Sequence, residues 1–559
     1  MSTIPSVVDQ LAEDFWDRFL ELSPISATLN GDHRWDDRLP DPGPDGRTRT
    51  RALAAWVRDA ALAIDVDGLP VEERITRDML HVVGEVLIKD DDQRIDTLQV
   101  VDQVAGPQTL LPQLTQLQRA DTPERLEAFC SRLRAYPAFM AANRDLLREG
   151  LASGLTAPRI VAERTIAQLE RMLAIPIDEA VVPAMAQVAS EADREVIRDI
   201  VRREVYPADA AFLEVLAGDY LAATRVDPGM WSAPDGEAIY CSQIQHWTTL
   251  DLDPVELHRI GLEEMASIEA ERRTIARRAG FGDDTTAYRQ SLADDPTNVP
   301  TSRQALVDRA MEDIERARAA AAGSFGRTPR SACRVQPVEE YKEEDAPFAY
   351  YFGPTPDGSR PGTYWVNTYD LETRLFSRLA ATTYHEATPG HHFQIALEVE
   401  NPNLNRFRRF GSRIVGGAYA EGWGLYSERL ADELGLYRSE AERFGMLDAQ
   451  AWRAGRLVTD TGMHALRWTR RQSIDYLLNE AGLTPTDATI ETDRYICWPA
   501  QALTYKVGQR EIERLRSELT ARDGAAFDLR TFHDEVLAHG TLPLATLSRE
   551  LPNWVATRT

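Results

Sequence analysis

Cysteine is scarce in this chain, with four among 559 residues, and the four lie far apart in the sequence. None forms the C-x-x-C pair that is typical of a zinc ribbon or a thiol redox motif, so neither kind of site is indicated. Free thiols suit a reducing compartment best. We expect all four to fill the core: Cys130, Cys241, Cys333 and Cys497.

Long apolar runs and an excess of basic residues are also missing. No stretch of about 18 apolar residues occurs, so we expect no membrane-spanning segment. The first residues, MSTIPSVVDQLAEDFWDRF, lack the basic and apolar regions of a secretory signal, and we expect a cytoplasmic protein. The formal net charge of -26 repels nucleic acid and anionic lipid, which makes a polyanionic partner improbable. Nothing in the sequence indicates the oligomeric state.

Helical periodicity is abundant. Apolar residues recur at three- and four-residue steps from Val8 to Leu22, and Pro24 follows directly. Residues 252–280 predict a long helix with Asp253 as N-cap and Gly280 at its end.

Strand signals are few. Residues 362–370, GTYWVNTYD, are rich in β-branched and aromatic side chains and predict a strand, whereas residues 322–337 read as an irregular connection. We therefore predict a mainly α fold with a small β-sheet beside the helix that ends near residue 386. Residues 1–240 would form an N-terminal helical region and residues 241–559 the region that carries the active site.

The segment YHEATPGHHFQ, residues 384–394, places three of the ten histidines within eight residues. The usual H-E-x-x-H zinc helix sets its histidines four residues apart, but here that position is a proline. In a regular helix His392 would lie about 10 Å along the axis from His385, too far to share one ion. The pair Pro389–Gly390 should break the helix and let one later histidine close on the metal. His391 is the favoured ligand, with His392 as the alternative or as a contact to substrate.

A zinc site with two histidines needs a third protein ligand and an open position for water. Glu421, in the segment GGAYAEGWGLYSERL, is the best candidate, because its small neighbours let helices approach closely. Glu428, seven residues on, is the weaker alternative. Glu386 would reach a water bound to the single zinc ion rather than the ion itself, and we expect it to act as general base.

Later segments offer further polar groups. Tyr505 could donate a hydrogen bond to an oxyanion, and Lys506 or Arg510 could bind a substrate carboxylate. His464 stands four residues after Asp460, which predicts either a supporting pair at the site or an ordinary hydrogen bond on a helix surface.

Five segments together resemble the bacterial family called domain of unknown function 885. They are YHEATPGHHFQ, AYAEGWGLYSERL, VTDTGMHALRWTR, RYICWPAQALTYKVGQ and FHDEVLAHGTLPLATL, and the resemblance extends over essentially the whole chain. It implies a mainly helical, zincin-like fold related to the gluzincin metallopeptidases, with two lobes and a deep cleft. It also implies that His385, Glu386, His391 or His392, and Glu421 take the metal and base positions.

On the same resemblance, the strand at 362–370 would be an edge strand that pairs with an extended substrate, with Tyr364 and Asn367 as contacts. Ala500 stands where we expect a glycine, a departure that bears on the backbone of that loop rather than on the ligands.

The leading hypothesis is a zinc hydrolase, a peptidase or carboxypeptidase that cleaves short peptides or other small amides. Two histidines and one carboxylate also describe a non-haem iron oxygenase, although that site needs no glutamate beside its first ligand. A third reading is a binding or scaffold protein whose metal is structural and whose removal would unfold the chain.

Overall fold

The computed structural model describes residues 5–338, 343, 346–356, 358 and 360–556. The structure is mainly helical, with 71% helix and 4% strand, which confirms the predicted mainly α class. Within the described residues, no helix combines the length and the apolar content needed to cross a membrane.

The chain divides into two compact units. The first comprises residues 1–242, 463–470 and 490–499, and the second comprises residues 243–462, 471–489 and 500–559. The chain thus leaves the first unit next to the expected boundary at residue 240, but it returns to that unit twice. The catalytic role expected for residues 241–559 stays a prediction.

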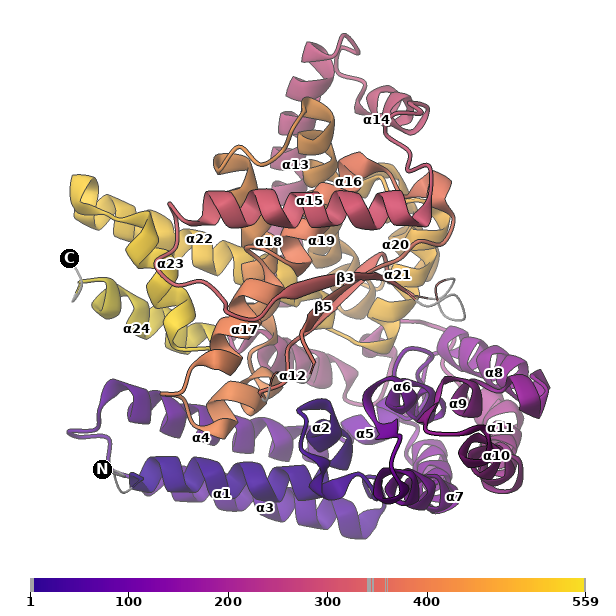
Figure 1. Cartoon of the computed structure of the whole chain (residues 1–559). Helices are drawn as coiled ribbons and strands as arrows, with labels where there is room; N and C mark the ends of the chain where they lie inside the picture. Colours follow the sequence, from indigo (N-terminus) through magenta and orange to yellow (C-terminus); the bar gives the residue numbers. More distant parts are fainter. Residues whose placement is uncertain (1–4, 339–342, 344–345, 357, 359, 557–559) are drawn as a thin grey trace. The chain divides into compact units, whose positions relative to one another are not determined.

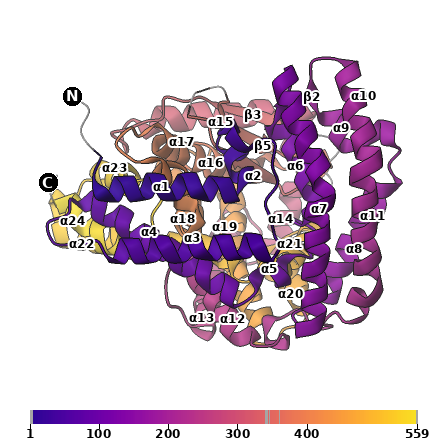
Figure 2. The same ribbon diagram turned by 90° about the horizontal axis from the view of Figure 1, so that it is seen from below.

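The first unit is built almost entirely of helices. Its opening helix begins where the Ser6 hydroxyl accepts a hydrogen bond from the Asp9 amide, and it buries Phe15 and Trp16. Figure 2 shows α1, α3 and α4 lying side by side. The elements are α1 (Val7–Leu22), α2 (Pro24–Leu29), α3 (Pro44–Leu62), α4 (Val71–Asp92), α5 (Ile95–Gln99), α6 (Leu110–Leu117), β1 (Arg119–Ala120), α7 (Pro123–Ser153), α8 (Arg159–Ala174), α9 (Val181–Met185), β2 (Gln187–Val188), α10 (Glu191–Ile200), α11 (Tyr206–Val215) and the start of α12 (Gly236–Thr248).

The second unit contains the helices that follow, of which α19, α20 and α21 also contribute residues to the first. The helix predicted at 252–280 is α13, and the Asp253 carboxylate caps it by accepting from the amides of Val255 and Glu256. The helices are α13 (Pro254–Arg278), α14 (Thr285–Ala293), α15 (Arg303–Ala321), α16 (Phe376–Glu386), α17 (His391–Glu400), α18 (Gly417–Glu433), α19 (Glu440–His464), α20 (Arg470–Tyr476), α21 (Pro485–Cys497), α22 (Thr504–Asp523), α23 (Leu529–Ala538) and α24 (Leu544–Ala556).

A three-stranded sheet in the second unit has the order β3-β5-β4. Strand β5 (Gly362–Val366) is the predicted strand, paired in parallel with β3 (Cys333–Pro337) and antiparallel with β4 (Ala349–Phe352). The expectation that β5 is an edge strand is therefore wrong, because both its sides are already paired. The expectation of irregular structure at 322–337 is wrong for its last five residues, which form β3.

The sheet packs against α15 and α16, and Figure 1 shows α15 running alongside β3. The buried contact includes Leu306 and Ile314 from α15, Tyr364 and Val366 from β5, and Leu379 from α16. Each such apolar side chain contributes about 1.5–3 kcal/mol when it is fully buried. This packing fixes α16, which ends in His385 and Glu386, against a rigid support.

Candidate metal centre

The helix breaks at the Pro-Gly pair, as predicted. Helix α16 ends at Glu386, and α17 begins at His391 after four residues whose backbone is not helical. A side chain at Gly390 would place its Cβ 1.9 Å from the carbonyl oxygen of His385, so only glycine allows the chain to turn so tightly. The indole of Trp423 donates to the carbonyl of Pro389 at 2.8 Å and anchors the turn from α18.

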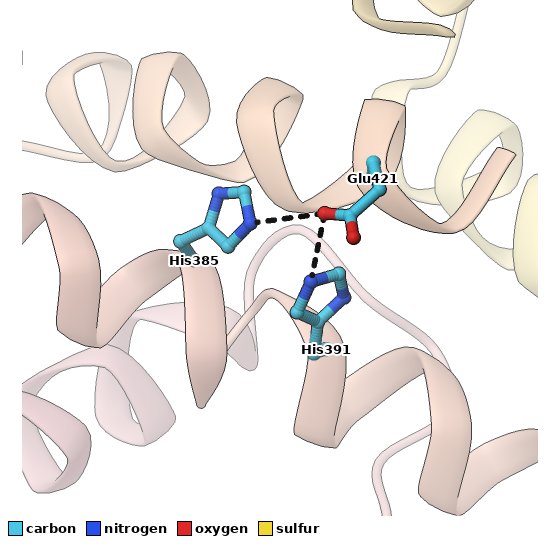
Figure 3. Close-up of side chains that lie close together, drawn as sticks. All are labelled: His385, His391 and Glu421. Carbon is cyan, nitrogen blue, oxygen red and sulfur yellow. Dashed lines mark ion pairs between the residues drawn. The ribbon is translucent and has the colours of Figure 1, made fainter. Parts of the chain in front are cut away.

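The break brings His391 back to His385. Their ring centroids lie 4.7 Å apart. The Nε2 atoms of His385 and His391 face the same oxygen of Glu421, Oε2, at 3.5 Å and 3.4 Å (Figure 3). Candidate ligand atoms of the three residues all lie within 4.8 Å of one another. The structure thus gathers three of the four residues that were predicted to bind metal.

Glycines allow α18 to pack closely enough to place Glu421 beside His385 and His391. Gly422 of α18 meets Gly508 of α22 so closely that a Cβ on Gly422 would lie 2.3 Å from the Gly508 backbone. Two residues on, a Cβ on Gly424 would lie 2.8 Å from the His385 ring. The predicted role of small residues around Glu421 is therefore visible at two separate contacts.

Glu428, one of the two carboxylates considered as third ligand, lies on the other side of His385. Its Oε1 accepts a hydrogen bond from His385 Nδ1 at 2.9 Å, and its side chain is fully buried. Burial lowers the pKa of His385, but the hydrogen bonds to Glu421 and Glu428 outweigh burial and raise the pKa to about 9. Because Nδ1–H donates to Glu428, Nε2 is the atom that His385 offers to Glu421 or to a metal.

His392 lies outside the cluster. Its Nε2–H donates to the carbonyl of Ser331 at 3.1 Å, and its Nδ1 accepts from the Tyr351 hydroxyl at 2.9 Å. Burial lowers its pKa to about 4, so the ring is neutral. With both nitrogens in use it has no lone pair to give, and we withdraw it as a metal ligand. Of the two open alternatives, the geometry favours His391.

Glu386 and Tyr505 flank the first histidine. Glu386 is buried, with 8% of its surface exposed, and among the described residues no side chain or amide hydrogen-bonds to its carboxylate. The Tyr505 ring stacks near the His385 ring, with centroids 6.2 Å apart. The guanidinium of Arg456, from α19, lies 4.0 Å from the centroid of the Tyr505 ring.

The two cations predicted to bind a substrate carboxylate have other partners. Lys506 is 2% exposed, and its ammonium donates to Gln450 and Gln509. Arg510 is exposed and forms an ion pair with Glu264. Because the Lys506 ammonium is buried and already donates to two protein side chains, we withdraw Lys506 as a clamp for a substrate carboxylate. Within the described part of the chain, no contact links Arg510 to His385, His391 or Glu421.

The remaining predicted substrate contacts are structural. His464 accepts from the Met230 amide at 3.1 Å and donates to the carbonyl of Tyr495 at 3.0 Å, within the first unit. Burial lowers its pKa to about 4. Its two nitrogens are occupied, and the expected pair with Asp460 is not formed; the Asp460 carboxylate instead accepts from the Ala500 amide.

Tyr364 and Asn367 of the predicted strand are also not placed to contact a substrate. Tyr364 is fully buried, in the core between β5 and α16. Asn367 is fully buried too, and its amide donates to the carbonyls of Glu343, Ala346 and Pro347. Both residues shape the sheet rather than a binding surface.

Sequence reasoning missed Gln450 and Arg453 of α19. Gln450 donates to Glu428 at 3.0 Å, and a guanidinium nitrogen of Arg453 lies 3.7 Å from the same carboxylate. The only signal in the sequence was the seven-residue interval from Glu421 to Glu428, which places both on one face of α18. Nothing in the sequence of α19 marks it as a neighbour.

The fold and the site define a mainly helical protein with an inward-facing group of two histidines and one glutamate. The chain belongs to the family described as "Bacterial protein of unknown function (DUF885)", which matches residues 24–551. No curated protein matches the chain.

Two solved structures are similar over nearly the whole chain. The "putative lipoprotein" from Colwellia psychrerythraea is 28% identical, with a TM-score of 0.93, and the match covers 98% of this chain and 99% of that one. A "putative lipoprotein of unknown function" from Shewanella oneidensis is 19% identical with a TM-score of 0.76, over 98% and 99% of the two chains. The second likeness concerns the fold alone.

Proposed function

We propose that this protein is a zinc-dependent hydrolase that cleaves peptide or other amide bonds, with a zincin-like active site. The observation that supports this most is the convergence of two imidazole nitrogens on one carboxylate oxygen of Glu421, beside the unpaired carboxylate of Glu386. Two nitrogen donors and one carboxylate are a common ligand set of catalytic zinc sites, which leave a fourth position open.

The contacts of His385 fit a cation at this place. Its Nδ1–H donates to Glu428, so Nε2 is the atom that faces Oε2 of Glu421, at 3.5 Å. The raised pKa of His385 means that a proton on Nε2 joins the two groups in the metal-free protein, and a metal ion would take the place of that proton. His385, His391 and Glu421 would therefore hold the ion.

When bound, zinc lowers the pKa of water toward 7 and polarises a carbonyl group. The residues of the chain supply the proton transfers. Glu386 takes a proton from the attacking water and later returns it to the leaving amine. Tyr505, which stacks on the His385 ring and contacts the guanidinium of Arg456, donates a hydrogen bond to the oxyanion of the substrate.

The first experiment is metal analysis of the purified protein, followed by digestion of a peptide library read by mass spectrometry. We expect about one zinc per chain and cleavage of short peptides. Glu386→Gln should keep the zinc but lower kcat by about 10²–10⁴-fold, because it removes general acid-base catalysis. Glu372→Gln, an exposed glutamate shortly before α16, is the matched control and should behave as wild type.

Other outcomes would contradict the proposal. Iron in place of zinc, together with full activity of Glu386→Gln, would point to an oxygenase. If removing the metal unfolded the chain and no substrate were cleaved, the metal would be structural.

Location is a separate proposal. We propose the cytoplasm, because the four cysteines are all free and a reducing compartment keeps them so. The names of the two similar structures raise the alternative of a lipid-anchored protein. Fractionation of cells that express the native gene would decide the matter: recovery in the membrane fraction would overturn the proposal.

A further inference from the structure

Lys506 is an enclosed cation close to the candidate metal centre. It is 2% exposed, and its Nζ donates to Gln450 Oε1 at 3.0 Å and to Gln509 Oε1 at 2.7 Å. A carboxylate oxygen of Glu264 lies 3.7 Å away. Burying an ammonium is costly unless it is paired and hydrogen-bonded, so each of these contacts is needed for the folded chain to tolerate the charge.

Gln450 links this cation to Glu428. The Gln450 side chain is fully buried, and its Nε2 donates to Glu428 Oε2 at 3.0 Å and to the carbonyl of Leu425 at 3.2 Å. An ammonium can only donate and an ionised carboxylate can only accept. The amide between them therefore has a single favourable orientation, with its oxygen toward Lys506 and its nitrogen toward Glu428.

Glu428 completes the connection. One of its oxygens accepts from Gln450, and the other accepts from His385 Nδ1 at 2.9 Å. Turning the carboxylate would break both hydrogen bonds at once. The direction of the His385 ring, and so the position of its Nε2, depends on the Glu428 carboxylate, which Gln450 in turn holds in place.

We propose that Lys506 is a positioning residue of the metal centre, which acts through Gln450 and Glu428 to aim Nε2 of His385 at the metal position. This inference rests on the proposed function, because it gives the aimed nitrogen a ligand to bind. It replaces the substrate clamp that the sequence suggested for Lys506 with a role inside the protein.

Loss of the Lys506 cation should weaken metal binding at the proposed site. Without Lys506, Gln450 Oε1 would be a buried acceptor with one partner fewer, which costs about 1–3 kcal/mol and favours rearrangement of the amide. A rearranged amide no longer restrains Glu428. Groups that orient a metal-binding histidine typically change metal affinity by about 10–100-fold when they are mutated.

The test measures the zinc dissociation constant of the full chain by competition with a chromogenic chelator. Lys506→Met should weaken zinc binding about tenfold, at the low end of the range for groups behind a ligand. Arg510→Met is the matched control: Arg510 lies one turn further along α22 and also contacts Glu264, but among the described contacts it has none with Gln450. Its zinc affinity should equal that of wild type.

Gln450→Met removes the side chain that links Lys506 to Glu428, and it replaces Lys506→Met as the test variant if Lys506→Met does not fold. It should weaken zinc binding to a similar extent, and the double variant should lose little more than either single variant. Additive losses would show that Lys506 does not act through Gln450. A lower melting temperature with unchanged zinc affinity would make Lys506 merely structural, and either result overturns the inference.

His385→Ala separates the two proposals. If wild type binds no zinc, or if His385→Ala binds it equally well, the proposed function fails. If His385→Ala loses zinc but Lys506→Met and Gln450→Met do not, the function stands and only the role of Lys506 is wrong.

Discussion

The lack of a Cβ at Gly424 leaves room for the His385 ring. A methyl group there would lie 2.8 Å from both Cε1 and Nε2 of the imidazole, closer than carbon atoms approach without displacement. The ring is buried against Gly424 and hydrogen-bonded to the carboxylate of Glu428, both residues of α18, so it has little room to move away. The absence of a side chain at one position is therefore part of the ligand geometry.

We expect Gly424→Ala to weaken zinc binding by at least about tenfold, a loss of the size seen when groups around a metal ligand are changed. Alanine favours a helix over glycine by about 1 kcal/mol, so the metal-free protein need not be less stable. Chelator competition and thermal melting measure the two effects separately.

Gly455→Ala is the control, because a Cβ there meets only ordinary contacts of 3.4 Å or more. It should leave zinc binding unchanged. Equal affinity in Gly424→Ala would show that the His385 ring can move without cost to the site.

At the scale of elements, the crossing of α18 and α22 places Glu421, Glu428 and Tyr505 around His385. Gly422 and Gly508 meet backbone to backbone at this crossing. Adding one methyl group forces two helices apart, and overpacking of a close contact typically costs about 1–3 kcal/mol.

Gly422→Ala should therefore lower the melting temperature and also weaken zinc binding, because Glu421 is the adjacent residue and moves with the helix. Gly323→Ala, at a turn where a Cβ would meet nothing closer than 3.9 Å, should do neither. Calorimetry of both variants with and without zinc tests this. A stable Gly422→Ala protein with normal zinc affinity would contradict the close crossing.

What the sequence predicted well at this scale was local. The cap of Asp253 and the break at Pro389–Gly390 depend on residues next to each other, and both occur in the structure. Strand pairing is not local. The sequence of β5 is compatible with either a central or an edge strand, and its partners β3 and β4 determine that it is central. The burial of Lys506 likewise depends on α19, which comes from about fifty residues earlier.

Ala500 shows the same division between local and distant information. The family resemblance led us to expect glycine at this position, and its φ of 70° lies in the left-handed region that favours glycine. The sequence around Ala500 does not show what stabilises this backbone conformation: the Ala500 amide donates to the carboxylate of Asp460, which lies on α19.

At the scale of the whole molecule, each unit contains a buried neutral histidine that is not one of the proposed ligands. Burial lowers the pKa of His464 in the first unit to about 4 and that of His533 in the second to about 3. In the unfolded chain a histidine has a pKa of about 6.5. Between these values the unfolded state binds more protons than the folded state, so stability is full above about pH 6.5 and falls as the pH drops.

We expect each histidine to cost up to about 3 kcal/mol of stability by pH 4. Melting curves from pH 8 to pH 4 on the metal-free protein measure this loss. His464→Gln and His533→Gln should each flatten the dependence on pH. A curve that is unchanged in both buried variants would place the acid sensitivity elsewhere.

The three proposed ligands lie on consecutive helices, from His385 in α16 through His391 in α17 to Glu421 in α18, all within the second unit. Closing a loop of this length costs little chain entropy, and the cost grows only slowly with length. All three come before α19 in the chain, but Gln450 of α19, which holds Glu428, and Gly508 of α22, which meets α18, come after them. Under the proposed function, a nascent chain that ends at α18 therefore has every ligand and lacks the residues that position them.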